Sequence, residues 1–264
     1  MKVKEFRSKF KGTADFIIMD VLGISKTELV LGDIDADEKH IEEIEQKINR
    51  LKNGEPLQYI LGKTEFMSLE FEVNPSVLIP RADTELLVEA VIERMPQTSQ
   101  IMDIGCGSGC IGISLAHYMG ASVTMVDISR DALKTAEKNA EKNGVLNKLT
   151  FINCDILKEI PDILVDCVVS NPPYIREDVI KTLDKNVRDF EPYIALSGGT
   201  DGLMFYRRIA EFAPLKNGGL LAFEIGYDQG KAVSDILKEN GYERIEILQD
   251  IENRDRTVLG YKMP

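Results

Sequence analysis

The chain of 264 residues is 44% hydrophobic and 29% charged, so it can bury one large core and a second, smaller one. Its formal net charge of −12, without any run of Lys and Arg, argues against a stable nucleic-acid partner and favours a basic protein surface as the partner. No segment has the length of a membrane span, and residues 1–10 lack the apolar stretch of a secretory signal, so we expect a cytoplasmic protein without a membrane partner.

The amino-terminal part of the chain is predicted to be helical. A helix over residues 16–22 ends at Gly23, and Ser25 with Glu28 forms a capping box that begins a second helix. A long third helix is expected to have Asp35 as its cap and to end at Gly54. Its apolar residues recur at helical spacing, at Ile41, Ile44, Ile48 and Leu51. We interpret this stripe as the core of a small bundle rather than as a groove for a partner.

A linker is predicted between the helices and the rest of the chain. Polar and apolar residues alternate from Thr64 to Val73, which indicates a β-hairpin. Arg81 follows the hairpin and has two interpretations, a carboxylate anchor for a ligand or a partner in an ion pair with Asp83 or Glu85.

The segment Asp103-Ile-Gly-Cys-Gly-Ser-Gly109 is predicted to be a ligand-binding turn between a strand and a helix. Glycines let a backbone approach a ligand closely, and a helix start offers unpaired N–H groups. The spacing from Gly107 to Gly112 also matches the dinucleotide fingerprint, but a strand that ends with Asp103 would repel a diphosphate. A carboxylate there suits a ligand with an ammonium and a sulfonium group, which is S-adenosylmethionine. The predicted cofactor residues here are Asp103, Gly105, Cys106, Gly107, Ser108 and Gly109.

Two further acidic residues follow predicted strands. Asp127 ends the run from Ser122, in the place to accept both ribose hydroxyls of a nucleoside, and Asp155 with Ile156 follows residues 149–153, in the place of an adenine edge. Either aspartate alone is more typical of a turn or a helix cap. Together with Gly105 and Asn171, they all lie just past the carboxyl end of a strand, which is where open α/β sheets bind ligands.

Asn171-Pro-Pro-Tyr174, directly after the apolar run from residue 164 to residue 170, is the most specific pattern in the chain. Proline fixes its own backbone and pushes the preceding residue toward an extended conformation, so no helix can use these carbonyls. The Asn171 side-chain oxygen and the Pro172 backbone oxygen can each accept one hydrogen of a planar –NH2 group. An ordinary turn at a strand end is the alternative for an Asn-Pro pair taken alone.

The remaining pattern alternates helices with strands. Helices are predicted over residues 131–143, 203–212 and 229–240, and strands over residues 164–170, 219–224, 244–248 and 256–261. Glu224, at a strand end, either faces a substrate or serves as a turn acceptor. The four cysteines and two histidines show no metal-ligand spacing, so we expect no metal and a reducing compartment.

These motifs resemble the peptide chain release factor glutamine methyltransferases, which are class I methyltransferases. The resemblance covers residues 16–262 and includes the segments 55–62, 77–85, 187–192, 198–203 and 224–226. It implies an α/β fold with a doubly wound, mostly parallel seven-stranded, Rossmann-like sheet whose last strands pair antiparallel. It also implies a helical substrate-recognition domain over residues 1–55, a linker with the hairpin over residues 56–80 and a methyltransferase domain over residues 81–264. Related chains begin with one more helix, for which residues 1–11 are short.

The resemblance implies methylation of the side-chain amide nitrogen of the glutamine in the Gly-Gly-Gln motif of class 1 release factors. S-adenosyl-L-methionine would be converted to S-adenosyl-L-homocysteine. Asn171 and Pro172 would orient the amide, Pro173 and Tyr174 would contact the substrate, and Asn171 would also border the cofactor. We expect the enzyme to be a monomer.

Three alternative functions remain at this point. A glutamine methyltransferase for a ribosomal protein would use the same site. A nucleic-acid amino-methyltransferase shares Asn-Pro-Pro-Tyr but disagrees with the acidic charge. A non-catalytic nucleotide-binding module would leave residues 171–174 unexplained.

Overall fold

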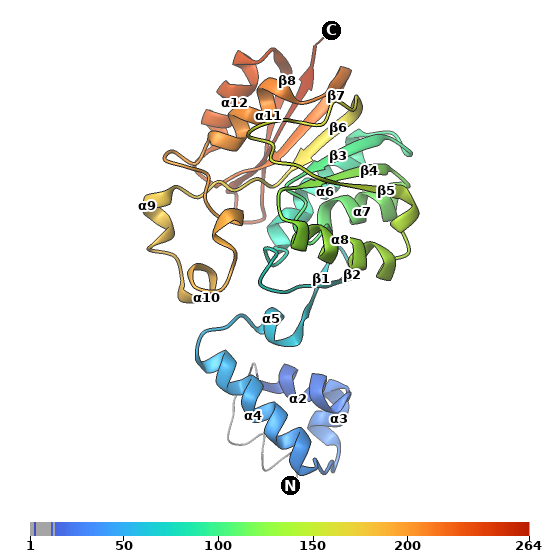
Figure 1. Ribbon diagram of the computed structural model, residues 1–264, viewed down its shortest axis with the longest axis vertical. Coiled ribbons are helices and arrows are strands. Elements are labelled where there is room, and N and C mark those ends of the chain that lie inside the picture. The colour runs from blue at the N-terminus through green and yellow to red at the C-terminus, as the bar shows by residue number, and fades with distance from the viewer. Residues whose placement is uncertain (1–2, 4–11, 13, 264) are drawn as a thin grey trace.

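The computed structural model describes residues 3, 12 and 14–263. Its amino-terminal helices form a small bundle that stands apart from the sheet (Figure 1): α2 (Ala14–Leu22), α3 (Lys26–Leu31), α4 (Glu38–Lys52) and the short α5 (Leu57–Leu61). The bundle has a core of its own, made mainly of isoleucine and leucine side chains. Apart from Val3, residues 1–11 lie outside the described part, and so does the expectation of a shortened first helix.

Two of the predicted helix caps can be compared with the structure. The capping box is confirmed, because the Glu28 backbone N–H donates to Ser25 Oγ at 3.2 Å and the Ser25 N–H donates to Glu28 Oε2 at 2.8 Å. The prediction that Asp35 caps the long helix is wrong. Asp37 is the cap, and its side chain accepts the His40 N–H at 2.9 Å. A capping oxygen must lie two or three residues before the N–H it accepts, and the chain turns into the helix only at residue 38.

The predicted hairpin consists of β1 (Lys63–Phe66) and β2 (Leu69–Glu72), paired antiparallel. Met67 and Ser68 form its two-residue turn, both with positive φ, as the twist of a hairpin requires. Phe66 and Phe71 are buried and meet edge to face at 6.1 Å between ring centroids. Both rings belong to the hydrophobic core that the main sheet shares with the helices on one of its faces. The hairpin of the linker therefore packs against the larger domain.

The main sheet has seven strands in the order β5-β4-β3-β6-β7-β9-β8. The strands are β3 (Gln100–Ile104), β4 (Ser122–Asp127), β5 (Leu149–Asn153), β6 (Val165–Ser170), β7 (Leu215–Glu224), β8 (Tyr242–Gln249) and β9 (Asp255–Lys262). Strands β3 to β7 are parallel, and β9 lies antiparallel between β7 and β8. The mostly parallel seven-stranded sheet and the antiparallel final pair are confirmed.

Helices cover both faces of the sheet (Figure 1), and alternate strand residues face the two layers. In β7, Leu220 and Ala222 belong to one core cluster, whereas Leu221 and Phe223 belong to the other. The first layer contains α6 (Glu85–Arg94), α7 (Cys110–Met119) and α8 (Arg130–Lys142). The second layer contains α11 (Met204–Phe212) and α12 (Gly230–Glu239).

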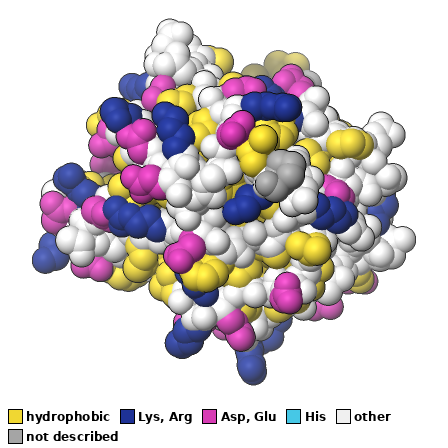
Figure 2. Space-filling model, turned by 90° about the horizontal axis from the view of Figure 1, so that it is seen from above, with side chains coloured by type: hydrophobic (Ala, Val, Ile, Leu, Met, Phe, Trp, Pro, Cys, Tyr) yellow, Lys and Arg dark blue, Asp and Glu magenta, His cyan; other side chains and the backbone are white. Residues whose placement is uncertain are grey.

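Short elements complete the chain: η1 (Ala82–Thr84), η2 (Leu146–Lys148), α9 (Glu177–Ile180), α10 (Lys185–Arg188) and η3 (Tyr193–Ala195). The loop with α9 and α10 projects from the sheet between β6 and α11 (Figure 1). Among the described helices, none is both long and apolar enough to cross a bilayer. On the face shown in Figure 2, acidic and basic side chains are intermingled with apolar ones.

Candidate functional site

A cavity lies at the carboxyl edge of the parallel strands, and most of the predicted site residues line it. The strand order places β5, β4, β3 and β6 side by side, so the segments that follow them meet at this edge. The predicted residues on its wall are Gly105, Cys106, Gly107, Ser108, Asp127, Asp155, Ile156, Asn171, Pro172 and Pro173. Asp103, Gly109 and Tyr174 are not on the wall.

The glycine turn between β3 and α7 has the geometry that the sequence indicates. Gly105, Gly107 and Gly109 all have positive φ, at 72°, 55° and 83°. A Cβ on Gly105 or Gly107 would meet no atom within 4 Å, so the space beside these two residues is open. At Gly109 a Cβ would instead press on the side chains behind the turn, so close packing requires a glycine there.

Asp103 lies inside β3 and is fully buried behind the turn. Its Oδ2 accepts the Gly112 backbone N–H at 3.0 Å, while Oδ1 has no partner among the described residues. Burial raises the pKa of this carboxyl to about 7; the bond from Gly112 opposes the rise, and the nearby Asp127 adds to it. A carboxyl with an unpartnered buried oxygen favours a positively charged group nearby.

Asp127, at the end of β4, lies between the glycine turn and the start of α8. Its Oδ2 accepts the Gly107 N–H at 2.9 Å, and its Oδ1 accepts the Ser129 N–H at 2.8 Å. Burial raises the Asp127 pKa, and these backbone bonds oppose the rise. A carboxylate has about four acceptor positions, so each oxygen retains capacity for a hydroxyl donor.

Asp155 follows β5 and differs in its environment from Asp127. Its side chain accepts the Leu157 N–H at 3.1 Å and pairs with Lys158 at 3.0 Å, and the Lys158 bond lowers its pKa. Its neighbour Ile156 contributes an apolar wall to the cavity. This corner of the cavity therefore combines one engaged carboxylate with an apolar surface.

Asn171 begins the segment after β6. Its Nδ2 donates to Thr84 Oγ1 at 3.3 Å. No described residue donates a hydrogen bond to Asn171 Oδ1 or to the Pro172 carbonyl. Two unused acceptors therefore stand at the cavity beside the glycine turn. Tyr174 lies farther along, packed against the second core cluster, and its carbonyl accepts a bond from Gln229 at 3.2 Å.

The cavity has further walls that the sequence did not single out, namely Thr84, Ile128, Ser129, Ile194 and Phe205. Only Thr84 stood in a motif that we had noted. Arg81 also lines the cavity, but both expected ion-pair partners were wrong: its guanidinium pairs with Glu191, whose side chain is 1% exposed. Asp83 pairs instead with Arg256 at 3.1 Å, and Glu85 accepts the Met67 N–H at 2.6 Å.

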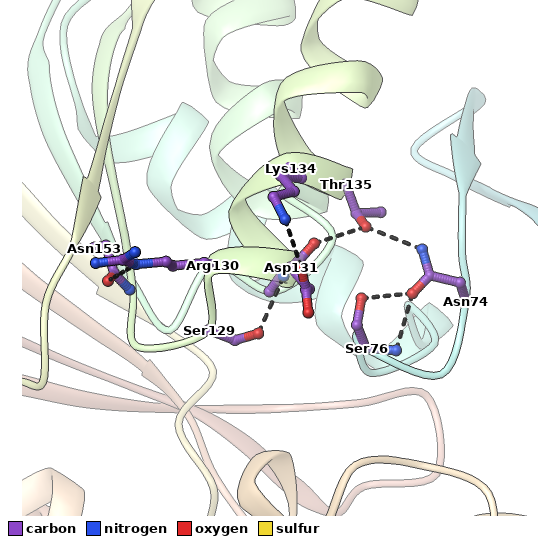
Figure 3. Close-up of polar contacts among 9 residues, drawn as sticks. Asn74, Ser76, Ser129, Arg130, Asp131, Lys134, Thr135 and Asn153 are labelled. Atoms are coloured by element: carbon purple, nitrogen blue, oxygen red, sulfur yellow. Dashed lines mark hydrogen bonds and ion pairs between the residues drawn. The ribbon is translucent and has the colours of Figure 1, made fainter.

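Polar contacts at one side of the cavity join the linker to the first two turns of α8 (Figure 3). Asn74 donates to Thr135 Oγ1 at 3.0 Å and accepts the Ser76 N–H at 2.9 Å. Ser129 caps α8 by accepting the Ala132 N–H at 3.1 Å. Ser76 and Ser129 both line the cavity. The bond between Asn74 and Thr135 therefore fixes the positions of these two walls relative to each other.

Glu224 ends β7, next to Asn171, and is 2% exposed. Burial raises its pKa to about 7, while hydrogen bonds with Thr84 and Asn171 and the charge of Arg256 act in the opposite direction. Its Oε2 has no hydrogen-bond partner in the described part of the chain, and Glu224 does not line the cavity.

Comparisons of the sequence and the structure with known proteins identify related methyltransferases. Residues 9–62 match the PrmC N-terminal domain, and residues 81–188 match the methyltransferase small domain. The release factor glutamine methyltransferase of Moorella thermoacetica is 47% identical over 223 residues, which are 82% of this chain and 78% of that protein. This chain belongs to the release factor glutamine methyltransferase family. The family member of Clostridium botulinum is 42% identical over 84% of this chain and 83% of its own length.

Membership of the release factor glutamine methyltransferase family confirms the resemblance seen in the sequence. A methyltransferase crystal structure from Pyrococcus furiosus has a TM-score of 0.58 with 17% identity and covers 83% of this chain and 99% of that chain. That likeness concerns the fold alone. The match to the methyltransferase small domain begins at Arg81 and ends at Arg188 in α10. It therefore contains the glycine turn and residues 171–174.

The buried Asp103 should make stability depend on pH. The pKa of Asp103 is about 7 in the folded protein and near 4 in the unfolded chain. Its contribution to the free energy of unfolding is therefore fully present at low pH and is lost as the pH rises through about 7. We expect Asp103→Asn to gain melting temperature relative to the wild type as the pH rises from about 5 to about 8. Thermal unfolding of both proteins at each pH measures this difference. The exposed Asp131→Asn is the control, and a difference for Asp103→Asn that does not change with pH would contradict the burial of its charge.

Proposed function

We propose that this protein transfers a methyl group from S-adenosylmethionine to the side-chain amide nitrogen of the glutamine in the Gly-Gly-Gln motif of class 1 release factors. One observation supports this most directly: Asn171 Oδ1 and the Pro172 carbonyl are unused acceptors at the cavity, one residue apart. An amide –NH2 carries two hydrogens in one plane, so two neighbouring acceptors can hold it in a single orientation. Family membership supports glutamine as the source of that amide.

The residues of the cavity fit S-adenosylmethionine as the methyl donor. The open space beside Gly105 and Gly107 admits a ligand against the backbone, and the unpartnered Asp103 oxygen behind the turn favours a cationic group. Asp127 would accept the ribose hydroxyls, and Asp155 with Ile156 would border the adenine. When bound, this cofactor supplies an electrophilic methyl group on a positively charged sulfur.

The reaction needs orientation because an amide nitrogen is a poor nucleophile. Its lone pair is delocalised into the carbonyl, and the nitrogen becomes more positive as it bonds to the methyl carbon. Asn171 Oδ1 and the Pro172 oxygen hold the nitrogen in line, and their hydrogen bonds strengthen as the N–H groups become more acidic. The carbon–sulfur electron pair stays on sulfur, and the extra proton on nitrogen leaves afterwards to water. Asn171 and Pro172 are thus the catalytic residues of the proposal, with Pro173 as a wall.

The helical bundle is proposed to contact the release factor outside the Gly-Gly-Gln loop. It carries exposed apolar side chains on α2 and α3: Phe16 at 53%, Val30 at 44% and Leu31 at 74% exposure. A bundle with its own core can present such a surface without disturbing the cavity.

The proposal is tested by supplying labelled S-adenosylmethionine together with a purified release factor, a ribosomal-protein mixture or DNA. We expect label on the release factor, and none on a factor whose Gly-Gly-Gln glutamine is replaced. Label on a ribosomal protein instead would favour the alternative substrate, and label on DNA would favour an amino-methyltransferase of nucleic acids.

Asn171→Ala should lower the rate of methyl transfer by about a hundredfold to a thousandfold, because one preorganised acceptor is lost. The measurement is single-turnover methylation of the release factor at saturating cofactor. Cofactor binding should persist, which separates a chemical defect from an unfolded site. Near-normal turnover of this variant would remove Asn171 from the mechanism.

Asp127→Ala should raise the cofactor dissociation constant about tenfold or more, since hydrogen bonds to a charged group contribute about 1.5 to 3 kcal/mol each. Calorimetry with S-adenosylmethionine measures this effect. Asp131→Ala is the matched control, because Asp131 lies in the first turn of α8, close to Asp127 in the sequence, but does not line the cavity. Equal affinities of the two variants would show that Asp127 does not hold the ligand.

Leu31→Glu should raise the KM for an intact release factor about tenfold, because it places a charge on the proposed contact surface, which corresponds to about 1.4 kcal/mol. The kcat and the cofactor affinity should stay unchanged. Leu164→Glu is the control, since Leu164 is 60% exposed but precedes β6 at the opposite edge of the sheet. If both variants have the wild-type KM, α3 does not contact the substrate.

A further inference from the structure

The side-chain amide of Asn171 can serve as an acceptor only if its oxygen, and not its nitrogen, faces the substrate. The two ends of an amide have the same shape, so the cavity walls alone do not select one orientation. Turned by half a revolution, the side chain would present a second –NH2 group to the –NH2 of glutamine. The proposed reaction therefore requires a group that anchors the nitrogen end of Asn171.

Thr84 and Glu224 occupy that position. Asn171 Nδ2 donates to Thr84 Oγ1 at 3.3 Å, and the pairing of Ser170 with Phe223 places the buried Glu224 beside Asn171, where the Thr84 and Asn171 side chains both act to lower the pKa of its carboxyl. Thr84 and Glu224 are each 2% exposed, so water does not compete for these bonds. They come from η1 and from the end of β7, two segments far apart in the sequence that meet behind Asn171.

The direction of a hydrogen bond between Glu224 and either Thr84 or Asn171 follows from the charge of Glu224. An ionised carboxylate can only accept, so the groups that face it must be donors. The Asn171 amide can meet this condition only with its nitrogen toward Glu224, and the Thr84 hydroxyl can donate to the same carboxylate while its lone pair accepts from Asn171. The Asn171 oxygen is then turned toward the cavity.

We propose that Glu224 and Thr84 are positioning residues that hold the Asn171 amide with its oxygen toward the substrate. This inference rests on the proposed function, since it explains how the acceptor of that reaction is oriented. Neither residue needs to touch the reacting atoms. Glu224 is absent from the cavity wall, and Thr84 reaches the wall beside Asn171.

The proposal predicts a dependence on pH. Protonated Glu224 becomes a donor as well, so it can bond to the Asn171 oxygen and stabilise the reversed amide. Because burial raises the Glu224 pKa to about 7, the correct orientation should be lost as the pH falls through about 7. The charged and titratable groups that face Glu224 are Arg256 from β9, Asp83 from η1, Cys110 from α7, Tyr206 from α11 and Tyr174. Of these, the cation Arg256 stabilises the ionised form and Asp83 opposes it.

The test compares Thr84→Val, Thr84→Ser and Glu224→Gln, with Glu211→Gln on the exposed side of α11 as the control. Single-turnover methylation of a release factor is measured between about pH 6 and about pH 9 at saturating cofactor. We expect kcat to fall about tenfold to a hundredfold in Thr84→Val and in Glu224→Gln, with little change in cofactor affinity. Thr84→Ser should retain the wild-type kcat because it keeps the hydroxyl. The wild-type rise of kcat with pH should be absent in Glu224→Gln.

Several results would overturn the inference. Equal losses in Thr84→Val and Thr84→Ser would indicate that Thr84 acts through packing. A normal kcat for Thr84→Val together with a lowered kcat for Glu224→Gln would indicate that the Glu224 carboxyl acts without Thr84. An unchanged pH profile in Glu224→Gln would assign the titration to another group.

A second measurement does not depend on the activity. The side-chain amide signals of Asn171 in the NMR spectrum of the wild-type protein should shift with a midpoint near the titration of Glu224. Absence of this shift would contradict the positioning role even if the enzyme proved to act on another substrate. Wild-type protein that methylates no release factor but shows the shift would contradict the proposed function and leave the orienting bonds established.

Discussion

The parallel pairing of β5, β4, β3 and β6 is the constraint on which the rest of the site depends. Ile104 pairs with Val126, so the turn after β3 starts beside the end of β4, and the N–H groups of Gly105 and Cys106 both donate to the Val126 carbonyl. Asp103 pairs with Val169, which brings the segment after β6 to the same edge. A slip of one residue in either pairing would turn every side chain to the opposite face. The register therefore sets the distance between a methyl donor and its acceptor.

A second set of contacts ties the amino-terminal bundle to this edge. The linker is anchored by the buried Phe71, and its later part lines the cavity at Ser76 and Pro80, directly before Arg81. Arg81 then pairs with Glu191, just before the residues of η3 that line the cavity from the other side. The connection from bundle to cavity thus runs through packed side chains, and a protein substrate bound on the bundle, as proposed above, would be held in a fixed relation to the site.

Sequence reasoning located the site where local pattern and strand order were sufficient. Asp127 and Asn171 were found because each follows a strand, and parallel strands bring such positions together. It assigned the cap of the long helix to Asp35 instead of Asp37, because an aspartate at either position fits the local pattern. It missed the Arg81 partner because Glu191 lies 110 residues away. Asp103 was predicted to bind the cofactor; the structure places it within β3, where its side chain is buried and accepts the Gly112 N–H from α7.

The carboxyl groups around the cavity explain why a glycine turn of this kind selects a different ligand from a dinucleotide-binding turn. Burial raises the pKa of Asp103, Asp127 and Glu224, so their ionised forms are costly in the protein without ligand. Donors offset that cost: backbone N–H groups at Asp127, and Thr84 with Asn171 at Glu224. Asp103 Oδ1 and Glu224 Oε2 have no partner among the described residues, and Asp103 is the one of these two that lies directly behind the glycine turn, so we propose that a ligand at the turn supplies the compensation there. A cationic ligand bound there would stabilise the folded protein, whereas a diphosphate would add a second uncompensated charge. We therefore propose that this turn discriminates between the two ligands by charge.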